Sequence, residues 1–269
     1  MDGNEIVLRH SEHAGPYRHR LPYLPAFFEK LGRLLPIEPG AMLLDLCCGT
    51  GELAAGFASA GTRVTGLEAA PGMIAAARQV PGAGYLLHDV NGPSAPGALS
   101  GHRFDHIVIG RAVPYITDGA LRLYVQEHLR GGGSVIICGS GLDPRVPWAA
   151  DFARLRGAYA PVRGDFIGAR KLAACGLTCC DKVVSQAGMS CDTNWLLRHA
   201  LSFALSHDAI EADLDAFSAR MTELTRPHLR EGKLRGSVMS WALVYRAVEF
   251  TPAAQQKAAS LLNSGPYPL

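Results

Sequence analysis

Two acidic residues and two glycines fall at positions where they could bind one small polar ligand. Residues 43–54 read LLDLCCGTGELA, so Asp45 lies inside an apolar run, and Gly49 and Gly51 precede a helical pattern. Glycines let the backbone turn tightly and approach a ligand, and the helix start offers free N–H groups to an anionic group. Glu68 closes the next apolar run, where a carboxylate can accept both hydroxyls of a ribose. Together these features predict a site for a nucleoside-containing ligand.

The same glycine-rich turn is open to another interpretation. Residues 49–54 also satisfy the dinucleotide fingerprint, with Ala54 in the third small-residue position. Asp45 argues against it, because a carboxylate there would repel a pyrophosphate and attract an amino group. Asp89 ends a third apolar run and could accept a hydrogen bond from an adenine amine. A turn without any ligand is disfavoured, since the turn and the carboxylate at Glu68 occur together and in order.

Strands and helices alternate along the part of the chain that must position these residues. The apolar runs predicted as strands are 42–46, 63–67, 84–87, 104–109 and 134–138, and the helical patterns between them are 52–60, 73–79 and 120–129. Several runs lack polar alternation, which is typical of strands buried on both faces of a parallel sheet. The order predicts a doubly wound α/β fold.

The segments before and after this alternation are predicted to cover it. Residues 1–40 form an N-terminal arm or lid with a helical pattern at 23–35. The main domain spans 41–250, with cap helices inserted at about 190–230; residues 194–224 are predicted as one long lid helix and 238–248 as the last strand. A C-terminal tail, 251–269, is expected to be loosely held.

Four segments carry a resemblance to a known family. Residues 45–51 (DLCCGTG) resemble motif I of the class I S-adenosylmethionine-dependent methyltransferases, residues 66–74 (GLEAAPGMI) resemble their second motif, and 88–90 (HDV) their third. Residues 104–109 are similar to their fourth strand. The resemblance implies a Rossmann-like sheet of seven strands with the last strand antiparallel, and a cofactor lying across the strand ends. Cys47 departs from the pattern, since glycine is commonest there, and adds a side chain beside the ligand.

The resemblance also implies roles for individual residues. It places the methionyl amino group of S-adenosylmethionine near Asp45 and the glycine loop, and the ribose on Glu68. It places the adenine between two apolar side chains with its amine on Asp89. The predicted cofactor-binding residues are Tyr17, Asp45, Cys47, Gly49, Gly51, Glu68, Ala69, Met73, Asp89, Val90 and Arg111.

Catalysis of methyl transfer would need few groups from the protein. The reaction is an in-line displacement from a sulfonium, so alignment matters most, and a base is needed only if the acceptor holds its proton at neutral pH. His13, His19 and Tyr115 are the predicted catalytic residues, and a solvated polar arm without a catalytic role is the ordinary alternative for the two histidines. Tyr17 could cover the sulfonium, and Arg111 could clamp a substrate carboxylate.

Composition excludes several other functions. The formal net charge is +2 with basic residues scattered, so nucleic acid is not an expected partner. No apolar stretch approaches the roughly 20 residues that a membrane span needs. Seven cysteines occur without the spacing of metal ligands, which predicts no metal site and a reducing cytoplasm. The chain does not reveal whether it forms oligomers.

These observations lead to one main hypothesis and three alternatives. The main hypothesis is a cytoplasmic S-adenosylmethionine-dependent methyltransferase acting on a small molecule, in biosynthesis or specialised metabolism. A cyclase or lyase could use the same pocket: the amino group of the cofactor would attack the cofactor's own side chain, or the sulfonium would be cleaved in another way, and methylthioadenosine would be released. An NAD(P)-dependent oxidoreductase is disfavoured by Asp45. A non-enzymatic binding module is disfavoured because the acids and glycines are all present.

Overall fold

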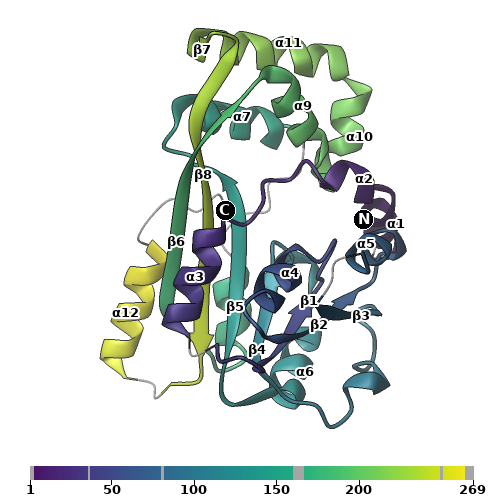
Figure 1. Ribbon diagram of the computed structural model, residues 1–269, viewed down its shortest axis with the longest axis vertical. Coiled ribbons are helices and arrows are strands. Elements are labelled where there is room, and N and C mark those ends of the chain that lie inside the picture. The colour runs from purple at the N-terminus through teal and green to yellow at the C-terminus, as the bar shows by residue number, and fades with distance from the viewer. Residues whose placement is uncertain (1–2, 36, 80–81, 160–166, 249–250, 264–269) are drawn as a thin grey trace.

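The computed structural model describes residues 3–35, 37–79, 82–159, 167–248 and 251–263 (Figure 1). The strands are β1 (Met42–Leu46), β2 (Arg63–Glu68), β3 (Ala83–Leu87), β4 (Phe104–Gly110), β5 (Leu129–Leu142), β6 (Thr178–Cys191), β7 (Leu229–Arg230) and β8 (Lys233–Arg246). The helices are α1 (Gly3–Glu12), α2 (Ala14–Tyr17), α3 (Pro25–Leu34), α4 (Glu52–Ala58), α5 (Pro71–Ala77), α6 (Asp118–His128), α7 (Pro147–Gly157), α8 (Ile167–Ala173), α9 (Thr193–Leu201), α10 (Ala204–Ala212), α11 (Leu214–Thr225) and α12 (Pro252–Asn263). None of these described helices combines the length and the apolar character needed to cross a membrane.

One sheet contains the described strands, in the order β3-β2-β1-β4-β5-β8-β6, and β7 pairs only with β8. The pairs from β3 to β5 are parallel, whereas β8 runs antiparallel to both β5 and β6. This confirms the predicted Rossmann-like doubly wound sheet of seven strands with an antiparallel last strand, to which β7 adds two residues. The strand order reverses between β1 and β4, and a ligand crevice in such sheets lies outside the carboxyl ends at that point.

Helices cover both faces of the sheet and bury the apolar strands between them. On one face α3 lies against β6 and β8 and α4 against β2 and β3, and these helices contribute Phe27, Leu31 and Phe57 to the buried cluster. On the other face α6 and α8 contribute Leu121 and Leu172. Phe27 and Leu31 are four residues apart, so they share one side of α3, and both are fully buried. Each such side chain contributes roughly 1.5–3 kcal/mol to stability.

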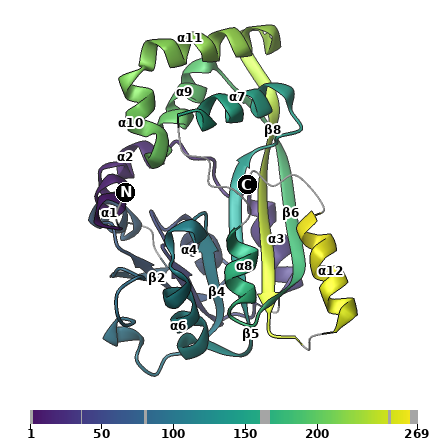
Figure 2. The same cartoon turned by 180° about the vertical axis from the view of Figure 1, so that it is seen from behind.

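A helical cap is built on three long strands. β5, β6 and β8 each have 14 residues, more than the strands of the other half of the sheet. Figures 1 and 2 show that these strands extend past the ends of the other strands toward the cap helices α7, α9, α10 and α11. The cap has its own apolar core, which includes Trp148, Phe152, Leu196, Ile210 and Phe217. The predicted C-terminal cap insertion is therefore present.

The single helix predicted over 194–224 is wrong, because the segment contains three helices. The first break falls at Phe203, whose backbone is extended (φ −95°, ψ 102°), and the second at Asp213 (φ −129°). Neither position holds the proline or glycine that usually signals a break. The breaks let Leu196, Ile210 and Phe217 reach one common core, so tertiary packing overrides the local helical preference.

The tail is also better ordered than its composition predicts. Residues 252–263 form α12, which packs beside β6. Ala258, Leu261 and Leu262 contact the apolar core on that face of the sheet. The expectation of a loosely held tail is thus wrong for α12, while residues 264–269 lie outside the described part of the chain.

Candidate functional site

The loop between β1 and α4 takes its shape from three residues in the left-handed backbone region. Gly49 (φ 56°) and Gly51 (φ 79°) adopt it at little cost, and Cys47 (φ 57°) adopts it despite its side chain. A Cβ at Gly51 would come within 2.6 Å of the Tyr85 hydroxyl oxygen, so glycine is needed there for space as well. The loop therefore exposes backbone rather than side chains at the carboxyl end of β1.

Asp45 is buried beneath this loop with no partner for its charge. Its side chain is 1% exposed, and neither carboxylate oxygen meets hydrogen-bond geometry with any described residue. Burial and the neighbouring Glu68 carboxylate raise the pKa of Asp45 well above its usual range, which the Ala54 amide and Arg111 offset in part. A buried carboxylate without a donor is costly, so this position fits a ligand that brings an ammonium or other N–H group.

Glu68 ends β2 and holds the glycine loop in place. One carboxylate oxygen accepts the backbone N–H of Gly49 at 2.9 Å, and the other accepts the N–H of Ala70 at 2.9 Å. A carboxylate offers about four lone-pair directions, so both oxygens can still accept a hydroxyl. The placement agrees with the ribose-binding role that the sequence predicts for Glu68, and it adds a second role in shaping the loop.

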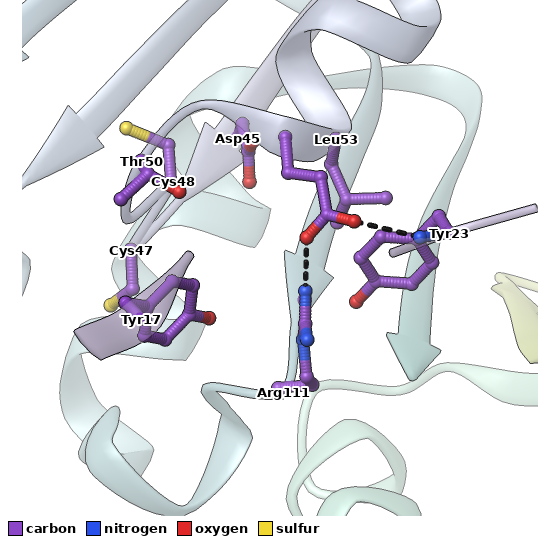
Figure 3. A pocket seen from close by; sticks show the side chains of 10 residues that line it. Tyr17, Tyr23, Asp45, Cys47, Cys48, Thr50, Leu53 and Arg111 are labelled. Atoms are coloured by element: carbon purple, nitrogen blue, oxygen red, sulfur yellow. Dashed lines mark hydrogen bonds and ion pairs between the residues drawn. The ribbon is translucent and has the colours of Figure 1, made fainter. Parts of the chain in front are cut away.

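A pocket lies at this loop, and an ion pair connects its walls (Figure 3). Glu52 at the start of α4 accepts the backbone N–H of Tyr23 at 2.7 Å and a guanidinium N–H of Arg111 at 2.5 Å. It thereby ties the N-terminal arm and the residue after β4 to the glycine loop. The residues that line the pocket are Tyr17, Tyr23, Asp45, Cys47, Cys48, Thr50, Glu52, Leu53, Gly110 and Arg111.

Aromatic rings of the arm surround the Arg111 guanidinium. Its carbon lies 4.7 Å from the ring centre of Tyr23 and 5.7 Å from that of Tyr17. Arg111 itself has a left-handed backbone (φ 60°), which directs it back toward the arm. Four predicted cofactor residues, Tyr17, Asp45, Cys47 and Arg111, thus line one pocket, although Arg111 is already neutralised by Glu52.

The other predicted cofactor residues follow the next two strands. Met73 on α5 and Val90 after β3 are buried, at 1% and 3% exposure, while Ala69 is partly exposed. Asp89 is exposed, and one of its oxygens accepts the N–H of Asn91 at 2.9 Å. Asp89 therefore keeps a free oxygen that a ligand amine can reach.

The three predicted catalytic residues do not line this pocket. His13 is buried, with Nδ1 2.6 Å from the Arg9 carbonyl oxygen and its ring 4.1 Å from that of His207. His19 is partly exposed, and burial, then Arg18 and Arg198, lower its pKa. The Tyr115 ring lies edge-on to His10, with 5.2 Å between ring centres.

Sequence reasoning missed the role of Glu52 in the pocket and the contact of His199 with the arm. Glu52 was read only as the start of a helix, although an acid directly after the glycine turn was the available signal. His199 on α9 is buried, and its Nδ1 lies 2.9 Å from the backbone carbonyl oxygen of His19. Burial and nearby arginines, Arg20 first, lower the pKa of His199 to about 3, so its ring is neutral at pH 7. No sequence signal linked it to the arm.

One group of described residues has donor atoms close enough for a metal ion. The ligand atoms of His13, His207 and Asp208 lie within 4.8 Å of one another, between the arm and α10. Asp208 already forms a 2.6 Å ion pair with Arg9, however, which competes for its carboxylate. The cysteines that the sequence draws attention to do not take part in this group.

Comparison with known proteins identifies the type of domain. Residues 43–133 match the family model described as a methyltransferase domain. A curated protein from Serratia marcescens, "Malonyl-[acyl-carrier protein] O-methyltransferase", is 42% identical over 73 residues, which are 27% of this chain and 29% of that protein. The match thus spans under a third of the relative's length. The family-model match at 43–133 covers the motifs on which the sequence resemblance was based, and that resemblance is confirmed.

Solved structures show the same fold over most of the chain. A structure from Anaeromyxobacter dehalogenans, described as a candidate type II methyltransferase, superposes with a TM-score of 0.64 at 16% identity, covering 84% of this chain and 96% of that one. An S-adenosylmethionine-dependent methyltransferase from Geobacter sulfurreducens, crystallised with S-adenosyl-L-homocysteine, gives a TM-score of 0.50 at 20% identity, covering 85% and 92%. At these identities the likeness concerns the fold.

Proposed function

Because residues 43–133 are a methyltransferase domain of the class I S-adenosylmethionine-dependent type, we propose that this protein transfers a methyl group from S-adenosylmethionine to a small molecule. One observation carries the proposal beyond the domain match. Asp45 is buried without a partner directly beneath the left-handed glycine loop, where the amino group of the donor would supply the missing charge. A nicotinamide dinucleotide would bring a pyrophosphate to the same carboxylate, which disfavours that alternative.

The remaining donor contacts follow from the residues around Asp45. Glu68 would accept the ribose hydroxyls with lone pairs that Gly49 and Ala70 leave free. Asp89 would accept the adenine amine, with Met73 and Val90 on either side of the ring. Tyr17 and Cys47 line the pocket at its methionyl end. This set of donors and acceptors matches an adenosyl group attached to an amino acid.

The protein's contribution to the reaction would be alignment and the exclusion of water. S-adenosylmethionine supplies an activated methyl group on a positively charged sulfur, and the charge disappears on transfer. Holding the acceptor in line can supply about 7–11 kcal/mol in favourable cases. The arm, held to the glycine loop through Glu52, covers the pocket with Tyr17 and Tyr23. We assign the arm the role of closing the site around both reactants.

We keep His13, His19 and Tyr115 as the proposed proton-transfer groups of the arm and of the loop after β4; none of the three lines the pocket beside Asp45, so this role requires the arm or the loop to move. His13 has the stronger case, since its Nε2 is buried and makes no hydrogen bond within the described residues. Its Nδ1 faces the Arg9 carbonyl oxygen, so the tautomer with a bare Nε2 is favoured.

A small acceptor is supported by the cap that stands over the strand ends. The name of the Serratia marcescens relative states a malonyl group on acyl carrier protein as its methyl acceptor. We propose that the group methylated by this chain is comparable in size to a malonyl group, and that the reaction is biosynthetic. The seven cysteines are all free thiols, which agrees with a cytoplasmic location.

Calorimetric titration of S-adenosyl-L-homocysteine tests the donor site. We expect the wild-type chain to bind it, and Glu68→Ala to weaken binding by about 1–3 kcal/mol through lost charged hydrogen bonds. Glu127→Ala, an exposed acid on α6, serves as the matched control and should bind like the wild type. Wild-type affinity in the Glu68 variant would contradict the ribose assignment.

Incubation with S-adenosylmethionine alone separates methyl transfer from cleavage of the cofactor. A methyltransferase forms S-adenosylhomocysteine only when an acceptor is present. Steady release of methylthioadenosine without an acceptor, followed by mass spectrometry, would instead indicate the cyclase or lyase.

A further inference from the structure

Two arginines from distant parts of the chain meet at one aromatic ring. Arg20 follows the arm helix α2, and Arg156 lies in the last turn of α7 in the cap. The guanidinium carbon of Arg20 is 3.7 Å from the ring centre of Phe203, and that of Arg156 is 3.8 Å from the same centre. Two planar groups this close to one ring centre must lie on its opposite faces. Phe203 is therefore held between two positive charges.

Neither guanidinium has an acid to balance it within the described residues. Arg20 and Arg156 form no ion pair and no side-chain hydrogen bond there, whereas Arg111 pairs with Glu52. Burial, followed by Arg111 and Arg156, lowers the pKa of Arg20 to about 10, and burial lowers the pKa of Arg156 to about 10. Largely buried charges are normally paired, so these two cations, which have no counter-charge among the described residues, fit an anion-binding site.

The histidine next to the pair does not balance it either. His199 packs edge-on to Phe203, with 5.1 Å between ring centres, and stacks on Trp195 at 5.1 Å. Its ring is neutral at pH 7, because burial and the arginines disfavour a further positive charge. The cluster of Arg20, Arg156, His199 and Phe203, here called the arginine cluster, thus has basic and aromatic groups only.

The arginine cluster adjoins the donor pocket through Tyr17. The Arg20 guanidinium carbon lies 5.7 Å from the Tyr17 ring centre, and Tyr17 lines the pocket beside Asp45 and the glycine loop. Arg20 and Arg156 both keep partly exposed surface, so a solute can reach them. They come from the arm and the cap, outside the methyltransferase domain match at 43–133.

We propose that the arginine cluster binds a carboxylate or phosphate group of the methyl acceptor, so that the acceptor is an anionic small molecule. This assignment rests on the proposed function. An anion at the edge of the Phe203 ring can offer one oxygen to each guanidinium, and Arg pairs strongly with both kinds of group. The ring of Phe203 lies between the two cations and separates them.

The anion is assigned to the acceptor rather than to the methionyl carboxylate of the donor. Arg156 and Phe203 belong to the cap, and Tyr17 stands between Arg20 and the pocket. Because the donor also carries a carboxylate, the experiment has to distinguish the two sources.

Calorimetry with inorganic phosphate and with benzoate, at constant ionic strength and saturating S-adenosyl-L-homocysteine, tests the site. We expect at least one of the two anions to bind the wild-type chain and Arg156→Gln to weaken it at least tenfold. Arg154→Gln is the matched control, since Arg154 lies two residues earlier on α7 with its side chain 78% exposed, and it should bind like the wild type. The preferred anion tells phosphate from carboxylate.

Nuclear magnetic resonance of the His199 ring gives a local readout of the same event. An anion at the edge of the Phe203 ring should raise the pKa of His199, so its ring signals should begin to shift at a higher pH in the anion-bound chain than without the anion. Phe203→Leu, which keeps both cations, should retain this difference. Circular dichroism checks that each variant is folded.

Three results would overturn the proposal. Binding of neither anion to the wild type would show that the cluster is not an anion site. Equal weakening by Arg154→Gln and Arg156→Gln would show general charge attraction. A tenfold loss of S-adenosyl-L-homocysteine affinity in Arg156→Gln, with methylthioadenosine binding unchanged, would place the donor's carboxylate on these arginines instead. Failure of the wild type to bind S-adenosyl-L-homocysteine at all would overturn the proposed function, and with it the assignment to an acceptor.

Discussion

The two halves of the site differ in the sign of their charged groups. The half built on the strand ends is lined by acids, with Asp45 buried and Glu68 at the glycine loop. The half built by the arm and the cap has Arg20 and Arg156 around Phe203. Acids suit the amino, hydroxyl and amine groups of an adenosyl amino acid, and guanidinium groups suit an anion. The contrast indicates that donor and acceptor are sorted by charge as well as by shape.

The strongest test of the contrast is to break the connection between the halves. Glu52 holds the arm through the Tyr23 amide and Arg111. In Glu52→Ala we expect the free energy of unfolding to fall by about 2–3 kcal/mol, because a largely buried Arg111 loses its counter-charge. Urea unfolding measures this, and proteolysis should cut the arm sooner. Glu29→Ala, at an exposed acid on α3, is the control; an equal loss there would contradict the role of Glu52.

The next test makes the donor half less acidic. In Asp45→Asn we expect S-adenosyl-L-homocysteine affinity to fall by about 1.5–3 kcal/mol, since a charged hydrogen bond is lost. Without ligand, the same change should raise stability at pH 7 by about 1 kcal/mol, because an unpaired buried carboxylate is removed. Calorimetry and urea unfolding measure the two opposite effects.

The pH dependence of Asp45→Asn sharpens the same test. The pKa of Asp45 is raised in the folded state, so the folded chain becomes less stable as pH rises above the usual range for an aspartate. Asp45→Asn has no carboxyl to ionise there, so the contribution of this position to the fall in stability with rising pH should disappear. Asp105 is the opposite case. Burial raises its pKa, but the Met42 amide and Arg130 lower it by more, so its contribution is present at neutral pH and lost as pH falls. Asp105→Asn should therefore reduce stability at pH 7. Stability changes of the same sign in both variants would contradict this account.

The smallest expected effect concerns the departure from the family's motif. Cys47 has a left-handed backbone, which costs about 1–2 kcal/mol for a residue with a Cβ. Cys47→Gly removes that strain but adds freedom to the unfolded chain, so we expect a net gain below about 1 kcal/mol. Thermal unfolding measures it. Cys48→Gly, at a buried position without the left-handed backbone, should lose stability, and a loss in both would refute the strain argument.

Sequence reasoning worked where the signals are local. The predicted strand 42–46 coincides with β1, because a short apolar run followed by glycines determines strand and turn together. The glycine loop, Asp45 and Glu68 could be assigned for the same reason. The positions of most strands in this half were also close to those observed.

The arginine cluster could not be predicted, because its members are far apart in sequence. Two features of the fold bring these residues together. The long strands β6 and β8 carry the cap to the arm, and the break before α10 places Phe203 between Arg20 and Arg156. That break has no proline or glycine, and it exists because three short helices bury more apolar surface in the cap than one long helix would. Packing that depends on distant partners leaves no trace in local composition.

The attachment of the cap to the sheet affects how reactants can enter the site and how products can leave it. β6 and β8 stay paired from Thr178 and Arg246 at the base to Cys191 and Leu234 at the cap, with one irregularity near the base. Because these two strands are hydrogen-bonded along their length, we do not expect the cap that they carry to rotate away from the sheet. The arm is held by separate side-chain contacts, among them Glu52 with the Tyr23 amide and Ser140 with the Leu21 carbonyl, rather than by a continuous strand ladder, so we expect it to be the part that moves when reactants enter and products leave.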